Sequence, residues 1–170
     1  MKSVVRILIA VLLAGLGGCC RTSAAPGSAE AFAQLKSLVG HWEEQKPSEH
    51  RATLDIELTA GGTALLERIH LLEQGKSVEM ITMYYLDGGH LKLTHYCVAG
   101  NQPTLRASYA PEAKTLTFDF ENATNLNSPN DGHMHHAVYI FLDADHFKTT
   151  WTFQKDQKEA FSEDAVYVRK

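Results

Sequence analysis

The sequence predicts an all-β protein, built as a single antiparallel up-and-down barrel of eight to ten strands with a short N-terminal helix. Three observations indicate this fold. Apolar and polar side chains alternate at a period of two after Gly40, turns such as Gly61-Gly62 and Asp87-Gly88-Gly89 separate the alternating runs, and no helical run lies between them. Short turns join antiparallel neighbours, and a sheet of this many strands tends to close. A β-sandwich is the alternative, although its crossing connection needs a long loop and 122–132 is the only long loop expected.

The first 18 residues have the pattern of a targeting segment. Lys2 and Arg6 precede an apolar run from Ile7 to Leu16, which is too short to span a hydrocarbon layer that requires roughly 20 residues. The run ends in Leu16-Gly17-Gly18-Cys19, which resembles the lipobox of bacterial lipoprotein precursors. The resemblance implies removal of residues 1–18 as a signal peptide and lipidation of Cys19. An ordinary cleaved secretory signal and an uncleaved anchor are the alternatives.

The lipoprotein resemblance also implies a location in the bacterial cell envelope. In lipoproteins an Asp directly after the lipidated cysteine commonly signals retention at the inner membrane, and this chain has Cys20 there. In a cell with two membranes we therefore expect the protein at the outer membrane, facing the periplasm. Removal of residues 1–18 takes away Lys2 and Arg6 and changes the formal net charge from −4 to −6. An acidic chain gives no attraction to nucleic acid or anionic head groups. We therefore expect no nucleic-acid partner, and membrane association through the lipid alone.

Beyond the signal the chain divides into a tether and one folded domain. Residues 19–30 are rich in Ser, Ala, Gly and Pro toward their end and predict a flexible tether. Residues 31–170 predict one β-barrel domain, long enough to enclose a core. Apolar residues recur at helical spacing from Phe32 to Val39, so we expect a short helix there that ends at Gly40.

The predicted strands follow one another in hairpins. Leu54, Ile56 and Leu58 alternate with polar residues before the Gly61-Gly62 turn, which is typical of a half-buried strand. Asp87-Gly88-Gly89 is a tight-turn signal between two further runs. The expected strands are 41–45, 53–58, 63–70, 76–86, 90–97, 104–109, 115–121, 133–142, 147–154 and 161–169.

The pattern Phe32-x-x-Leu35-x-x-Leu38-x-Gly40-x-Trp42 resembles the short helix and Gly-x-Trp that begin lipocalin-like (calycin) barrels. In those proteins the Trp closes one end of the barrel, and the strand count extends the resemblance over most of 32–169. Calycins include lipid carriers, fatty-acid-binding proteins, biotin binders and haem-binding nitrobindins, so the resemblance selects no ligand. The sequence lacks the paired disulfide cysteines of secreted lipocalins, and Glu44 stands where nitrobindins have a second glycine. It is most similar overall to bacterial lipoproteins of unassigned function with this kind of domain.

Three cysteines are present, Cys19, Cys20 and Cys97. If Cys19 carries lipid, two thiols remain in an oxidising compartment. Cys20 lies beside the anchor and Cys97 far along the chain in an apolar strand. We therefore expect Cys97 to be a small buried core residue rather than the partner of Cys20 in a disulfide.

Histidines are the main candidates for a site. In the 91–97 run, alternation places His95 on the same face as Leu91 and Leu93, so we expect it to point inward. His133 and His135 share one face of their strand with Ala137, Tyr139 and Phe141, while Met134 begins the other row. Both rows are apolar, so the inward row of this strand stays open.

Convergence of His95, His133 and His135 would resemble a zinc site with an open fourth position for water or ligand. The alternatives are a haem ligand among these histidines and, as we prefer, polar contacts in a ligand pocket or a structural role. The cofactor therefore remains unknown, with zinc possible and haem the weaker option. The other candidate ligand contacts are Tyr84, Tyr96, Asn101 and Gln102.

The sequence gives less support to a serine nucleophile, a phosphate-binding loop or a calcium site. Ser108 and Ser162 lack a nucleophile-elbow context, and no Gly-rich phosphate loop follows a strand. Asp87, Asp143 and Asp145 fit turns better than a calcium site. The aromatic residues are expected in the core, with barrel lining as the alternative; they are Trp42, Phe118, Phe120, Trp151 and Phe153.

The function that the sequence favours is that of a lipid-anchored envelope protein that holds a small, partly apolar ligand inside its barrel. Such pockets are mostly apolar with a few placed polar groups. The first rival is a metal-dependent enzyme that uses His95, His133 and His135. The second is an envelope interaction protein whose barrel is filled by side chains. No catalytic residue is assigned, and the oligomeric state stays open.

Overall fold

The computed structural model describes residues 27–45, 51–73 and 75–170, with the backbone alone at Arg51 and Glu73. The predicted signal peptide, the lipidation site Cys19 and most of the predicted tether lie outside these residues. Within them, no helix has the length and apolar character that a membrane span requires.

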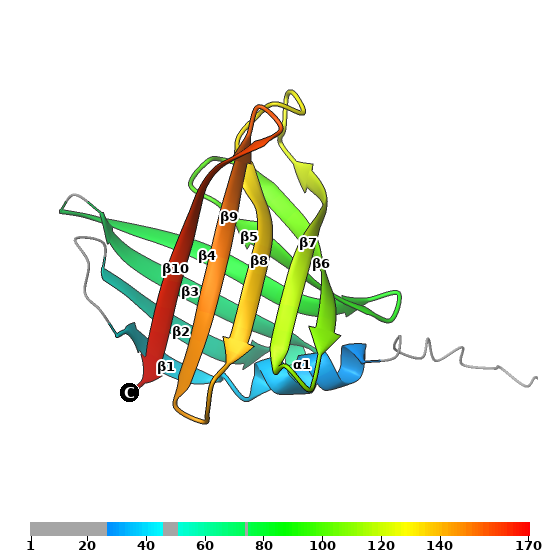
Figure 1. Ribbon diagram of the computed structural model, residues 1–170, viewed down its shortest axis with the longest axis vertical. Coiled ribbons are helices and arrows are strands. Elements are labelled where there is room, and N and C mark those ends of the chain that lie inside the picture. Colours follow the sequence, from blue (N-terminus) through cyan, green and yellow to red (C-terminus); the bar gives the residue numbers. More distant parts are fainter. Residues whose placement is uncertain (1–26, 46–50, 74) are drawn as a thin grey trace, which may run out of the picture.

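The described chain forms one short helix, a single 3-10 turn and ten strands. Each strand hydrogen-bonds to its sequence neighbours in antiparallel fashion, and β1 pairs with both β2 and β10, so the sheet closes into a barrel (Figure 1). The predicted all-β up-and-down barrel is therefore confirmed. The elements are α1 (Ser28–Lys36), β1 (Gly40–Glu44), β2 (Arg51–Thr59), η1 (Ala60–Gly62), β3 (Ala64–Glu73), β4 (Lys76–Asp87), β5 (His90–Tyr96), β6 (Gln102–Ala110), β7 (Thr115–Thr124), β8 (His133–Phe141), β9 (His146–Lys155) and β10 (Lys158–Arg169).

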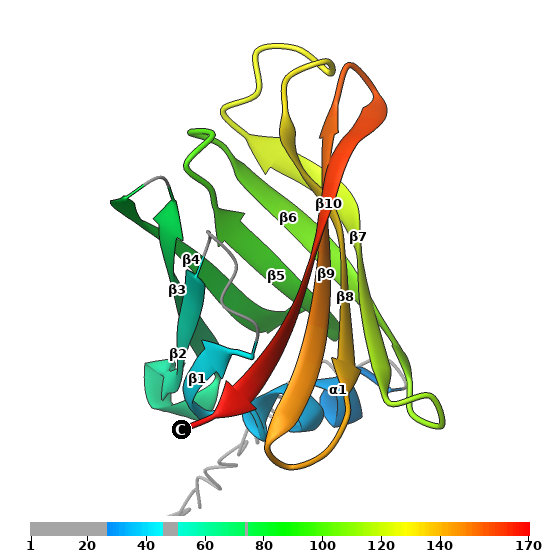
Figure 2. The same cartoon turned by 60° about the vertical axis from the view of Figure 1, so that its left-hand side comes forward.

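The helix α1 lies across one end of the barrel, as both views show (Figures 1 and 2). It begins at Ser28, inside the segment that the sequence assigned to the tether, and ends at Lys36, before the expected Val39. Its buried residues Ala31, Phe32 and Leu35 join the core of the barrel. The apolar face recognised in the sequence is therefore correct, and the helix starts about one turn earlier than predicted.

Trp42 closes the barrel at the helix end. Its side chain is fully buried, its Nε1 donates to the carbonyl of Leu38 at 2.7 Å, and its ring meets that of Phe147 edge to face, with ring centroids 4.7 Å apart. The Arg169 guanidinium lies 4.2 Å from the Trp42 ring centroid and donates to the carbonyls of Ser37 and Val39, each at 2.8 Å. These bonds satisfy carbonyls beyond the end of α1 and join the last strand to the first.

Gly40 allows this close approach of the first and last strands. Its φ of +142° is rarely adopted by residues with a side chain, and a Cβ atom there would lie 2.9 Å from Nη1 of Arg169. The glycine that the sequence marked as the end of the helix therefore has a second role at the barrel closure.

Candidate functional site

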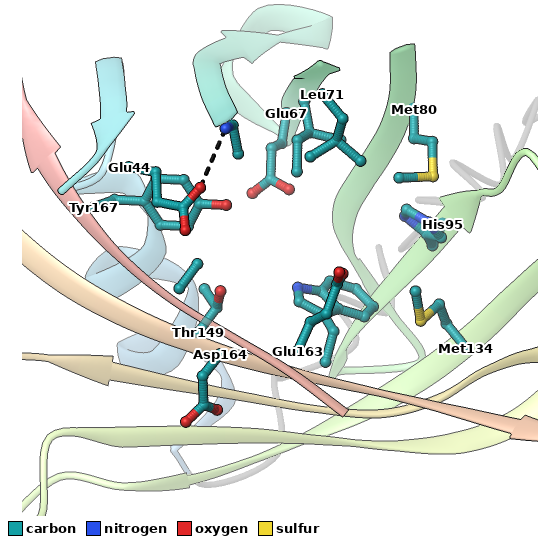
Figure 3. A pocket seen from close by; sticks show the side chains of 14 residues that line it. Glu44, Glu67, Leu71, Met80, His95, Met134, Thr149, Glu163, Asp164 and Tyr167 are labelled. Carbon is teal, nitrogen blue, oxygen red and sulfur yellow. Dashed lines mark hydrogen bonds between the residues drawn. The ribbon is translucent and has the colours of Figure 1, made fainter. Parts of the chain in front are cut away.

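An internal cavity of about 140 Å³, here called the inner chamber, lies inside the barrel, and Figure 3 shows the side chains that line it. Side chains from eight of the strands, β1 to β5 and β8 to β10, form its wall. The wall residues are Glu44, Ala52, Glu67, Ile69, Leu71, Met80, His95, Met134, Thr149, Trp151, Glu163, Asp164, Ala165 and Tyr167.

A second space of about 380 Å³, here called the outer recess, continues from the inner chamber. The two share Leu71, Met80, Met134 and Glu163 in their walls, so they adjoin at these side chains. The rest of the outer recess is largely apolar, formed by Val78, Cys97, Val98, Ala99, Phe153 and Phe161. The interior therefore combines a partly polar inner part with an apolar outer part, as pockets for small ligands commonly do.

Three polar residues on adjacent strands form a row, and the two outer ones, Glu67 and His95, line the inner chamber. Glu67 on β3 stands opposite Thr82 on β4, and Thr82 stands opposite His95 on β5. All three side chains are nearly inaccessible to solvent. Nδ1 of His95 lies 3.0 Å from Oγ1 of Thr82, and Thr82 also hydrogen-bonds to Glu67. Cross-strand pairing therefore links a buried carboxyl to a buried imidazole through one hydroxyl.

Glu67 is the buried acid of this row, with 4% of its surface exposed. Burial raises the pKa of its carboxyl to about 7, although hydrogen bonds from Tyr84 and Thr82 lower it in part. The Tyr84 hydroxyl donates to Oε2 of Glu67 at 2.9 Å and lies 2.7 Å from the Tyr139 hydroxyl. Because Tyr84 has one proton to donate, its bond to Glu67 leaves Tyr139 as the donor to Tyr84.

His95 carries the unsatisfied polar atom of the chamber. Its Nε2 is buried and has no hydrogen-bond partner among the described residues, and Figure 3 shows the ring directed toward the open centre. Burial lowers the pKa of His95 to about 4, so the ring is neutral at neutral pH. When Glu67 is ionised, Thr82 donates to it and His95 Nδ1 donates to Thr82, which leaves Nε2 as an acceptor.

Trp151 supplies the aromatic part of this wall. Its ring centroid lies 5.1 Å from that of His95 at an interplanar angle of 40°. Trp42 and Phe118 are fully buried core residues as predicted, whereas Trp151 lines the inner chamber and Phe153 the outer recess. For the last two, the alternative of barrel lining is the correct one.

His133 and His135 lie together but line neither space. His133 Nδ1 donates to the carbonyl of Asp131 at 2.9 Å, so its Nε2 accepts from His135 Nδ1 at 3.1 Å. Both rings pack on Phe120, with centroids 4.5 and 5.0 Å away. Burial and the neighbouring His133 lower the pKa of His135.

The convergence of His95, His133 and His135 that the alternative of a zinc site requires is not present in the part of the chain that the structure describes. No three His, Cys, Asp or Glu side chains there are grouped so as to hold a metal ion. The pairing register between β8 and β9 shifts between Met134 and His136, which places Met134 in the chamber wall, on the same side as Ala137 and Tyr139. The strict alternation that grouped His133 and His135 with Ala137 and Tyr139 on one face therefore does not hold across this bulge.

The remaining predicted contacts have different positions. Tyr84 belongs to the polar network, whereas Tyr96 is 50% exposed and lines neither space, since it alternates with His95. Asn101 is buried, donates from Nδ2 to the Gly132 carbonyl at 2.8 Å and borders a polar recess between loops. Gln102 accepts a hydrogen bond from Thr124 and lines neither space.

Cys97 also differs from the expectation. It is half-buried in the wall of the outer recess rather than in the core, and burial raises the pKa of its thiol. The chain turns away from β5 after Tyr96, so the alternation that predicted a core position no longer applies at Cys97. Cys20 lies outside the described residues.

Sequence inspection missed Glu67, Thr82 and Thr149. A signal for Glu67 was present, because it alternates in phase with the apolar residues Leu65, Ile69 and Leu71. A carboxyl in an inward apolar row is rarely tolerated without partners. The partners themselves could not be identified, since Tyr139 is 72 residues away along the chain from Glu67.

Comparison with known proteins supports the fold alone. No protein-family model matches the sequence, and no curated protein is similar to it. The crystal structure of Rv2717c from M. tuberculosis superposes with a TM-score of 0.60 at 15% identity, over 87% of this chain and 99% of that one. A protein of unknown function from the DUF3598 family of Nostoc punctiforme gives a TM-score of 0.49 at 11% identity, over 80% of this chain and about half (48%) of its own length. The described part of the chain is therefore a closed antiparallel barrel of ten strands, and the structure of Rv2717c has a similar fold.

Proposed function

We propose that this protein binds a small, partly apolar ligand inside its barrel, at the surface of the bacterial envelope to which lipid on Cys19 anchors it. The observation that carries the binding proposal is Nε2 of His95, a buried polar atom that faces the inner chamber and has no partner among the residues that the structure describes. A buried polar group without a hydrogen bond costs free energy. A ligand that donates a hydrogen bond to Nε2 would remove this cost.

The size of the interior supports the same proposal. The inner chamber of about 140 Å³ is close to the roughly 150 Å³ of an engineered protein cavity that takes up benzene. It therefore has room for a group the size of a six-membered ring. The adjoining outer recess, of about 380 Å³, offers an apolar surface to the remainder of a longer molecule.

A matched pair of threonines on β9 provides the test. Thr149 lines the inner chamber, whereas the neighbouring Thr150 bonds to Asp164 from the opposite face of the strand. Binding of the neutral, polarity-sensitive probe N-phenyl-1-naphthylamine is measured by fluorescence. The mature protein is held in lipid nanodiscs, because detergent monomers would compete for the apolar recess, and empty nanodiscs serve as the blank.

We expect Thr149→Met to weaken probe binding at least tenfold and Thr150→Met to leave it unchanged, since only the first side chain enters the chamber. Thermal unfolding shows whether both variants are folded, and Thr149→Leu, with Thr150→Leu as its control, replaces the methionine pair if Thr149→Met is not. Absence of probe binding to the wild-type protein, or equal effects of the two methionine variants, would contradict interior binding.

The lipid anchor is tested separately. Cys19→Ala removes the thiol that would carry the lipid, so we expect it to abolish incorporation of radiolabelled palmitate and to leave the precursor unprocessed. Cys20→Ala is the matched control and should be labelled normally. Normal processing and membrane association of Cys19→Ala would contradict the lipoprotein assignment.

A further inference from the structure

We propose that the polar group of the ligand is a primary ammonium, bound in the inner chamber between the carboxylate of Glu67 and Nε2 of His95. The inference rests on the proposed function and narrows the ligand class to amines with an apolar tail. The tail would lie along Met80, Met134 and Trp151 and continue into the outer recess.

The first support is the sign of the charges around the cavity. The charged residues in the walls of the two spaces are Glu44, Glu67, Glu163 and Asp164, and no Lys or Arg is among the described residues that line them. Asp164 forms an ion pair with Lys148 at 2.6 Å and also accepts a hydrogen bond from Thr150. Both partners lie on the outward face of β9. A carboxylate or phosphate ligand would therefore meet repulsion without a cationic partner, whereas a cation would meet attraction.

The second support is the hydrogen-bonding complement of the site. An ammonium group carries three donors and no acceptor. Ionised Glu67 accepts hydrogen bonds. Thr82 then donates to Glu67 and accepts from Nδ1 of His95, so Nε2 of His95 is an acceptor, and it has no partner among the described residues. The hydroxyl of Thr149, also in the chamber wall, is a third acceptor. The imidazole does not repel the cation, because burial keeps it neutral.

The third support is the nature of the walls. The Trp151 ring faces the chamber, and aromatic rings attract cations through their negative faces. The thioethers of Met80 and Met134 are polarizable and adapt to apolar chains of different shape. A charged head and an apolar tail are thus each matched by a different part of the interior.

The titration of Glu67 should make the affinity for an amine depend on pH. The titratable groups that face it are Tyr84 on β4, His95 on β5, Tyr139 on β8, Glu44 on β1, and Glu163 and Tyr167 on β10. The pKa of its carboxyl is about 7 without ligand, and a bound ammonium would lower it. Amine binding below pH 7 therefore releases a proton, and amine affinity should rise about fivefold from pH 6 to pH 7, as the ionised fraction of Glu67 does.

Three probes with one chain and different head groups test the inference: hexylamine, hexanol and hexanoate. Their affinities for the nanodisc-held protein are measured at pH 7.5 by displacement of N-phenyl-1-naphthylamine, with empty nanodiscs as the blank. We expect hexylamine to bind at least tenfold more tightly than hexanol, and hexanoate to bind most weakly.

The variant Glu67→Gln removes the charge and keeps the shape. It should reduce hexylamine affinity to that of hexanol and abolish the rise with pH, while hexanol binding changes little. Glu57→Gln is the control, since Glu57 is on the outer face of β2, paired with Arg68 at 2.7 Å, and its replacement changes the net charge equally. It should leave all three affinities as in the wild type.

The outcomes separate the two proposals. Hexanol binding equal to or tighter than hexylamine binding, or a hexylamine affinity unchanged in Glu67→Gln, overturns the ammonium inference and leaves interior binding in place. Failure of the fluorescent probe itself to bind the wild-type protein contradicts interior binding. If Glu67→Gln does not fold, Glu67→Ala replaces it with the same expected results. A wild-type affinity for hexylamine that does not rise from pH 6 to pH 7 would then also overturn the ammonium inference.

Discussion

Nδ1 of His95 lies 3.0 Å from Oγ1 of Thr82, and this hydrogen bond directs the opposite ring nitrogen into the inner chamber. Thr82 also bonds to Glu67, so one hydroxyl sets both the orientation of the imidazole and the protonation of its nitrogens. The polar character of the chamber therefore depends on a residue that does not line it.

Replacement of Thr82 by Val should reduce probe affinity about tenfold, since the His95 ring loses the bond that orients it. The lost hydrogen bond should cost about 1 kcal/mol of unfolding free energy. Thr94→Val is the matched control, because Thr94 bonds to Tyr85 and Thr104 on the other face of β5. Probe titration and urea unfolding measure the two effects. A Thr82→Val protein that binds the probe as the wild type does would contradict this role.

The buried acid and the buried base should give opposite dependences of stability on pH. The pKa of Glu67 rises from 4.5 to about 7 on folding, so native Glu67 keeps a proton that the unfolded chain releases. Stability therefore falls by about 3 kcal/mol as pH rises through this window. The pKa of His95 falls from 6.5 to about 4, so the unfolded chain binds the extra proton. Stability therefore rises by about 3 kcal/mol from pH 4 to pH 6.5.

In the wild-type protein these two contributions largely cancel between pH 4.5 and 6.5, and single variants separate them. Relative to the wild type, Glu67→Gln should gain stability as pH rises from 4.5 to 7, and His95→Phe should lose stability as pH rises from 4 to 6.5. Urea unfolding at each pH provides the free energies. Profiles of both variants that run parallel to the wild-type profile would show that neither group is perturbed in the folded state.

Trp42 should be among the most important residues for stability. It is fully buried against Phe147 and Arg169, so Trp42→Ala should cost about 3 to 5 kcal/mol of unfolding free energy. Trp151→Ala is the comparison, because its ring already borders a cavity and should cost less than half as much. Urea unfolding measures both, and a loss below about 1 kcal/mol for Trp42→Ala would place the residue outside the core.

Zinc binding distinguishes the structure from the arrangement that the sequence suggested. Since His133 and His135 bond to each other and His95 bonds to Thr82, we expect no zinc site that uses both His95 and His135. Titration of metal-free wild type, His95→Ala and His135→Ala by calorimetry tests this expectation. Micromolar or tighter binding in the wild type that is lost in both variants would restore the metal site.

The sequence predicted the features that depend on local periodicity. Alternation with Leu91 and Leu93 correctly placed His95 inside the barrel, and the Gly40-x-Trp42 pattern correctly marked the closed end. It did not fix the face of His133 and His135, because the bulge in β8 is set by pairing with neighbouring strands.

The hydrogen-bond network around Glu67 could not be predicted from the sequence, for a different reason. Glu67 meets Tyr84 and Tyr139 only because barrel closure brings strands β3 and β8 to a common interior. Nothing in the neighbourhood of either tyrosine in the sequence indicates this contact. The acid in an apolar row was visible, but the groups that make its burial tolerable were not.

The most direct test of interior binding is the ¹⁵N NMR spectrum of the His95 imidazole, recorded at pH 7.5 with and without hexylamine or N-phenyl-1-naphthylamine, and assigned with His95→Phe. We predict a neutral ring with the proton on Nδ1 in the free protein, and a change in the Nε2 resonance when either molecule donates a hydrogen bond to it. A His95 spectrum that stays unchanged while either molecule is bound would place the binding elsewhere and contradict the role assigned to this chamber.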